Sequence, residues 1–168
     1  LIAAWLSFKT TQKEVRDNNE FTWGPIKEVA ILFLGIFITM IPALLILKAK
    51  GGELGLTQPW QLFWVTGAMS SFLDNTPTYL VFLTTASTLG ATSGVLTTLG
   101  YVSPILLIAI SCGAVFMGAN TYIGNAPNFM VKAIAEESGV KMPSFGGYLA
   151  WCGRFLIPGF ILDTFLLF

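Results

Sequence analysis

The sequence predicts an all-α membrane protein that contains a re-entrant helical hairpin and a discontinuous transmembrane helix. Hydrophobic residues make up 54% of the 168 residues and charged residues 11%, with a mean hydropathy of +0.73, whereas soluble domains carry about 25% charged residues. The uncharged run from Val29 to Leu47 is long enough to cross a bilayer as a helix. Two further apolar runs are each interrupted by an Asn-x-Pro sequence, at Asn75 and at Asn125.

The composition also excludes several classes of function. Nine basic and nine acidic residues give a net charge of zero, so no basic surface for nucleic acid is expected. Histidine is absent, which excludes histidine-based zinc sites and catalytic triads. Cys112 and Cys152 lie in apolar runs, as buried free thiols commonly do. We therefore expect no enzyme activity, no catalytic residue and no cofactor, with the lipid bilayer as a partner.

The order of apolar and polar runs defines the expected elements. They are the end of a preceding span (1–8), a cytoplasmic loop (9–28), a complete span (29–48), a re-entrant hairpin (59–87), a discontinuous helix (101–135) and a last span (147–168). The first run lacks a beginning, so we expect the chain to be the C-terminal half of a longer protein. The hairpin arms Trp60–Leu73 and Tyr79–Ala86 are each too short to cross a bilayer. One long broken helix is the alternative interpretation of these two arms.

Charges in the loops predict the orientation in the membrane. Six basic residues lie within the 9–28 and 132–146 segments: Lys9, Lys13, Arg16, Lys27, Lys132 and Lys141. Two basic residues, Lys48 and Lys50, lie on the opposite side. Because positively charged loops remain in the cytoplasm, both segments are expected to be cytoplasmic.

Asp74 is the strongest candidate for a functional residue, because it is the only acidic residue between Leu54 and Lys132 in a largely apolar part of the sequence. A carboxylate at a helix centre in a membrane costs about 2.5–3.5 kcal/mol on insertion scales, so such residues are generally functional. Burial favours the neutral form of a carboxyl group, which would allow it to exchange a proton for a cation. The alternative role is an N-cap for the helix that starts near Pro77.

The two Asn-x-Pro sequences belong to an internal repeat. Residues 72–81 align with residues 122–131, with asparagine, proline and valine identical in the two segments. Proline is tolerated at the start of a helix, so Pro77 and Pro127 each predict a new half-helix. Its free N–H groups would face the break, and the preceding half-helix would present free carbonyl oxygens suited to Na⁺.

The polar residues at these breaks are the candidate ion or substrate ligands. They are Asp74, Asn75, Thr76, Thr121, Gly124, Asn125 and Asn128, with Na⁺ expected at Asp74, Asn75 and Asn125. The competing interpretation is that these side chains satisfy the backbone groups that any buried helix break leaves unpaired. The two roles are compatible.

Residues Ser70–Tyr79 and Gly118–Phe129 together resemble the C-terminal half of the ion transporter superfamily, within it the sodium:proton antiporter and citrate-transporter-like group. The resemblance covers the chain from about Val29. It implies two inverted-topology halves, each with a re-entrant hairpin and a discontinuous helix, and a site between their tips. It also implies a multi-pass homodimer in the bacterial inner membrane, with an N-terminal half that completes the site.

These features lead us to expect a secondary active transporter. Na⁺/H⁺ antiport by alternating access, with Asp74 exchanging protons and cations, is the first interpretation. A di- or tricarboxylate (citrate-like) symporter or an oxyanion permease of the same fold is the alternative, in which anions would favour the helix N-termini. A third interpretation, an intramembrane aspartyl protease, would need two carboxylates in contact. Asp74 is central whereas Asp163 lies near a predicted helix end, so the sequence disfavours this interpretation.

Overall fold

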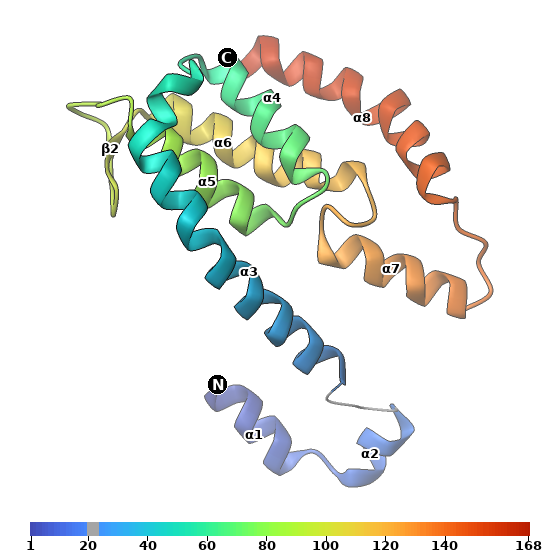
Figure 1. Cartoon of the computed structure of the whole chain (residues 1–168). Coiled ribbons are helices and arrows are strands. Elements are labelled where there is room, and N and C mark those ends of the chain that lie inside the picture. The colour runs from blue at the N-terminus through green and yellow to red at the C-terminus, as the bar shows by residue number, and fades with distance from the viewer. Residues whose placement is uncertain (20–23) are drawn as a thin grey trace. The chain divides into compact units, whose positions relative to one another are not determined.

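The structure, a computed structural model, describes residues 1–19 and 24–168, and it is mostly helical (Figure 1). Its elements are α1 (Ile2–Thr10), α2 (Lys13–Asn18), α3 (Gly24–Lys50), η1 (Gly51–Leu54), α4 (Pro59–Ser70), α5 (Asn75–Ser87), β1 (Val95–Thr97), β2 (Gly100–Val102), α6 (Pro104–Phe116), η2 (Met117–Asn120), α7 (Ala126–Glu137) and α8 (Phe145–Leu167). The chain divides into two compact units, Leu1–Ile38 and Thr39–Phe168.

The first unit contains α1, α2 and the beginning of α3. Arg16 in α2 donates to the carbonyl oxygens of Phe8 (2.5 Å) and Ser7 (3.0 Å) at the end of α1. Its guanidinium also lies 4.2 Å from the centre of the Phe8 ring. The segment expected to be a loop, 9–28, therefore contains a short helix and the first turn of α3, and its residues 20–23 lie outside the described residues.

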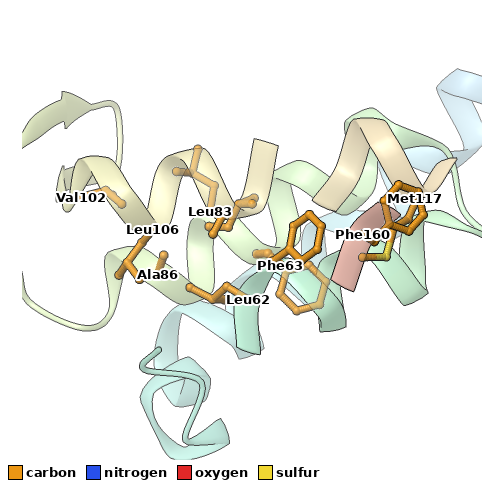
Figure 2. Close-up of a cluster of buried hydrophobic side chains, with 11 residues drawn as sticks. Leu62, Phe63, Leu83, Ala86, Val102, Leu106, Met117 and Phe160 are labelled. Carbon is orange, nitrogen blue, oxygen red and sulfur yellow. The ribbon is translucent and has the colours of Figure 1, made fainter. Parts of the chain in front are cut away.

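The core of the second unit is formed where α4, α5 and α6 pack against one another. Figure 2 shows the buried apolar cluster, to which β2, η2 and α8 also contribute. Its members are Leu62, Phe63, Phe82, Leu83, Ala86, Val102, Leu106, Ala109, Ile110, Met117 and Phe160. The core thus joins the hairpin arms to the helix that follows them, and it fixes where the ends of α4 and α6 lie.

Small residues allow α4 and α6 to approach closely. A Cβ atom on Gly113 of α6 would overlap the carbonyl oxygen of Phe63 in α4, and one on Gly67 of α4 would overlap the side chain of Met117. Packing of helices through small residues is typical of membrane proteins, because van der Waals contact replaces the hydrophobic effect there.

A small antiparallel β-hairpin, which the sequence does not predict, connects α5 to α6. Val95 pairs with Val102 and Thr97 with Gly100. The Thr97 hydroxyl donates to the carbonyl oxygen of Gly100 (2.7 Å), and Gly100 has a φ of 116°, which favours glycine. Val102 is buried in the core, so β2 positions the start of α6.

Among the described residues, α8 is the one helix long and apolar enough to cross a membrane by length and composition. Only 11% of its apolar window is buried within the chain, whereas a core helix of a soluble protein would be mostly buried. Pro104–Asn120, which comprises α6 and η2, is a shorter apolar helix.

Candidate functional site

Two helix interruptions lie together at one end of the core. The first, here called the hairpin tip, is residues 71–74 between α4 and α5. The second, here called the second break, is residues 121–125 between η2 and α7. Both occur at the Asn-x-Pro sequences, as the repeat indicates.

Hydrogen bonds join the hairpin tip to the segment that leads into the second break. Ser70 at the end of α4 donates to the carbonyl oxygen of Ala114 (2.5 Å). The Ser71 hydroxyl lies 2.9 Å from the Gly67 carbonyl oxygen and 3.0 Å from that of Met117, and it accepts from the Asn120 amide (3.1 Å). The Thr121 hydroxyl donates to the Ser71 carbonyl oxygen. These bonds satisfy backbone groups that a bilayer could not.

Asn75 extends this network from the first residue of α5. Its amide nitrogen donates to the carbonyl oxygens of Ala114 (2.9 Å) and Gly124 (3.2 Å), and it lies 2.9 Å from the Ser70 hydroxyl. The side chain predicted as a ligand therefore bridges α5, α6 and the second break.

Gly124 brings the backbone of the second break against the hairpin tip. A Cβ atom at this position would lie 2.7 Å from the Gly118 carbonyl oxygen and 2.8 Å from those of Ser70 and Ser71. Three carbonyl oxygens thus lie against the Cα of Gly124, so only a glycine fits where the second break meets the hairpin tip.

Thr121 and Asn128 support the backbone of the second break. The Thr121 hydroxyl accepts from the Gly124 N–H (2.9 Å). The Asn128 amide donates to the carbonyl oxygens of Gly118 (3.1 Å) and Thr121 (3.0 Å). Both side chains therefore make the backbone bonds that the competing interpretation of the sequence requires.

Asp74 caps the N-terminus of α5. Its half-buried carboxylate accepts from the Thr76 N–H (3.2 Å), and its backbone carbonyl oxygen accepts from the Thr78 hydroxyl (3.0 Å). Pro77 is the third residue of α5 rather than the first. Its missing N–H still costs nothing, because the first four N–H groups of a helix lack intrahelical partners. Thr76 is exposed.

Asn125 differs from Asp74, although both precede a half-helix. It is the N-cap residue of α7, yet its half-buried side chain makes no cap hydrogen bond. Pro127 lies at the second position of α7, as the sequence predicts for a helix start. The N-terminus of α7 and the Asn125 amide are therefore available to a bound ion or solute.

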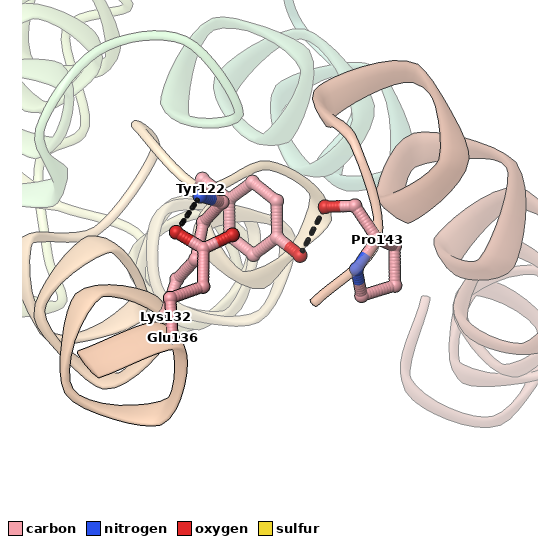
Figure 3. Close-up of polar contacts among 4 residues, drawn as sticks. All are labelled: Tyr122, Lys132, Glu136 and Pro143. Carbon is pink, nitrogen blue, oxygen red and sulfur yellow. Dashed lines mark hydrogen bonds and ion pairs between the residues drawn. The ribbon is translucent and has the colours of Figure 1, made fainter. Parts of the chain in front are cut away.

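Tyr122 is a residue of the second break that the sequence did not single out. Its buried ring stacks on Tyr148 of α8, with ring centres 4.2 Å apart. Figure 3 shows its hydroxyl donating to the Pro143 carbonyl oxygen (3.0 Å), beside the Lys132–Glu136 ion pair (2.6 Å). An aromatic residue directly after Thr121 in a polar interruption was the available signal. Through these contacts Tyr122 connects the second break to α8 and to the segment that precedes it.

Two cavities adjoin the breaks. One of about 220 Å³ lies between the end of α4, η2 and α8, and Ser71, Asn120 and Cys152 line it. The other, of about 470 Å³, is lined by Tyr122, Lys132, Glu136 and Lys141. Among the described residues no cluster of three or more side chains that could hold a metal ion occurs.

Broken apolar helices whose polar groups gather at the interruptions define a membrane protein of the transporter class. The chain belongs to a transport family: the family model described as "Putative citrate transport" matches residues 1–168. This finding confirms the resemblance to citrate-transporter-like ion transporters. No curated protein and no solved structure matches the chain.

Proposed function

We propose that the protein is a secondary active transporter of a citrate-like di- or tricarboxylate, coupled to a monovalent cation. The family match supports a carboxylate as cargo. The observation that carries the proposal is the N-terminus of α7, where the Asn125 side chain makes no cap hydrogen bond. A free helix N-terminus attracts an anion, and the carbonyl groups of a helix break are what transporters present to a coupling cation.

Na⁺/H⁺ antiport is the second candidate, and Asp74 favours it. This residue is the only acidic one between Leu54 and Lys132, and its carboxylate is half-buried. A group that holds either a proton or a cation is what an antiporter needs. In the carboxylate transporter, Asp74 would instead serve α5 as a cap only.

The proposal extends to the surroundings of the site. Alternating access would expose the two breaks first to one side of the membrane and then to the other. We propose a multi-pass protein of the bacterial inner membrane, with an N-terminal half that completes the site and a homodimer as the working unit. Na⁺ and H⁺ would be transported or coupling ions, not cofactors.

The test uses the full chain in proteoliposomes with a trapped pH dye, to which NaCl, LiCl, KCl and sodium citrate are added in turn. Uptake of labelled citrate that requires Na⁺ is expected. A luminal pH change with NaCl or LiCl alone would instead identify the antiporter. No response to any of the salts would refute both candidates.

The Asp74→Asn variant separates the charge of Asp74 from its capping role. Asparagine caps a helix about as well as aspartate, so α5 should remain intact. We expect citrate uptake to persist in this variant if Asp74 is only a cap. If the protein is an antiporter, the same variant should lose the pH response to Na⁺, and retention of full exchange would exclude Asp74 as the proton carrier.

A further inference from the structure

The two asparagines of the internal repeat have different surroundings. Asn75 lies within hydrogen-bond distance of three groups on three other segments, whereas the Asn125 side chain makes no hydrogen bond with the described residues. Equivalent positions in the repeat are therefore not equivalent in the structure.

Chemistry fixes the direction of the hydrogen bonds at Asn75. Ser70 has one hydroxyl proton, and it lies 2.5 Å from the Ala114 carbonyl oxygen, which can only accept it. The Ser70 oxygen can then only accept, so the Asn75 atom 2.9 Å from it is the amide nitrogen, whose two protons are shared among the three acceptors around it. The other two neighbours of the amide are the carbonyl oxygens of Ala114 and Gly124, which also only accept. The end of Asn75 that faces the second break is therefore its NH₂ group.

An NH₂ group surrounded by acceptors is a donor and not a cation ligand. The space around it is also filled, because a Cβ atom on Gly118 would overlap the Asn75 amide. The amide thus connects α5 to the end of α4, to α6 and to the second break.

We propose that Asn75 is a positioning residue, which holds the hairpin tip and the second break together as one body. The nature of the bound ion in this proposal rests on the proposed function, but the connection between the two breaks does not. A cation would then meet two breaks that are already joined, because the Asn75 amide lies within hydrogen-bond distance of the Ser70 hydroxyl and of the Ala114 and Gly124 carbonyl oxygens.

Substitution by aspartate distinguishes a positioning residue from a ligand. Aspartate has the shape of asparagine but, when ionised, donates no hydrogen bond. In Asn75→Asp it would place an acceptor against two carbonyl oxygens, so we expect the breaks to separate and Na⁺ affinity to fall at least tenfold. In the matched variant Asn125→Asp, a carboxylate replaces an amide that makes no hydrogen bond with the described residues, so we expect the two breaks to stay together.

Two measurements on the full chain in nanodiscs test this. The first is equilibrium binding of ²²Na⁺. The second is the dipolar coupling between nitroxide labels at Phe72 and Ile123, which are exposed beside the two breaks, in a protein without Cys112 and Cys152. We expect weaker coupling in Asn75→Asp and unchanged coupling in Asn125→Asp.

Unchanged coupling together with unchanged or tighter Na⁺ binding in Asn75→Asp would overturn the proposal and make Asn75 a ligand. If Asn75→Asp does not fold, Ser70→Ala replaces it, because this variant removes one acceptor of the Asn75 amide. It should weaken the dipolar coupling between the labels to a smaller extent. Unchanged coupling in Ser70→Ala would likewise refute the proposal. If the wild-type protein binds no Na⁺, the proposed function fails, but the label coupling still decides the role of Asn75.

Discussion

Gly124 is the residue at which the backbones of the two breaks come closest. An added Cβ atom would meet three backbone carbonyl oxygens at 2.7–2.8 Å, and backbone atoms cannot move aside as a flexible side chain can. We expect Gly124→Ala to destabilise the protein by about 1–3 kcal/mol, the usual cost of overpacking. Thermal unfolding in detergent measures this.

The control for Gly124→Ala is Gly153→Ala. Gly153 lies in α8, and apart from its own helix backbone no atom of the described residues lies within 4 Å of its added Cβ. Alanine is a better helix former than glycine, so the unfolding temperature should stay the same or rise. Equal stability of Gly124→Ala and the wild type would show that the close approach at the second break is not required.

Tyr122 provides a second residue-scale prediction. Tyr122→Phe removes the hydroxyl that donates to the Pro143 carbonyl oxygen but keeps the ring that stacks on Tyr148. We expect a loss of about 1 kcal/mol of stability, the typical net worth of one hydrogen bond. Tyr101→Phe, at an exposed position of β2, should change nothing. A similar loss in both variants would contradict the role given to Tyr122.

At the residue scale the sequence predicts which side chains gather at the breaks, but not what each one does. Asp74, Asn75, Thr121 and Asn128 were all expected as ligands or as backbone partners, and both interpretations were open. The bonds of Thr121 and Asn128 to backbone groups depend on the path of the chain between Gly118 and Gly124. A linear pattern does not contain that path, because it results from the packing of α4 against α6.

At the scale of elements, the contact between α4 and α6 makes an ordered prediction. Gly113→Ala would press a methyl group against the backbone of Phe63, whereas Gly67→Ala would press one against the flexible Met117 side chain. Methionine rearranges more easily than backbone. We therefore expect Gly113→Ala to lower the unfolding temperature more than Gly67→Ala. The reverse order in a thermal-shift assay would contradict this packing.

The helix breaks were predictable from sequence and the β-hairpin was not. Pro77 and Pro127 each follow an asparagine by two residues within an apolar run, a local signal that needs no tertiary information. The residues from Thr88 to Thr98 are mainly small and polar, with little of the alternation that predicts strands. Their pairing depends instead on Val102, which is held in the core.

At the scale of the whole molecule, α8 tests the membrane assignment. Phe155 is exposed near the middle of α8 and Phe165 is exposed near its end. A lysine at the centre of a spanning helix costs about 2.5–3.5 kcal/mol, and near an end its side chain reaches the interface. Phe155→Lys should therefore reduce membrane insertion of α8 strongly and Phe165→Lys only slightly. A glycosylation-based insertion assay measures both, and equal insertion would contradict a span centred near Phe155.

Composition alone predicts that the whole molecule is a membrane protein, because 54% hydrophobic and only 11% charged residues are not typical of a soluble domain. The cargo was not determined in the same way. Asp74 is compatible with a proton carrier and with a cap, so the sequence ranks antiport first, whereas the family match shows a transporter without distinguishing antiport from carboxylate transport.

The bonds from Ser70 and Ser71 to Ala114 and Met117 have a consequence for biosynthesis. When the ribosome has delivered α4 and α5, the carbonyl groups that these hydroxyls will contact have not yet been made. The polar tip of the newly made hairpin must therefore remain in water or in contact with the translocation machinery until residues 114–121 have been synthesised. Insertion of this hairpin is thus expected to be late and dependent on downstream sequence, and truncation of the chain before Ala114 should leave the hairpin outside the membrane core.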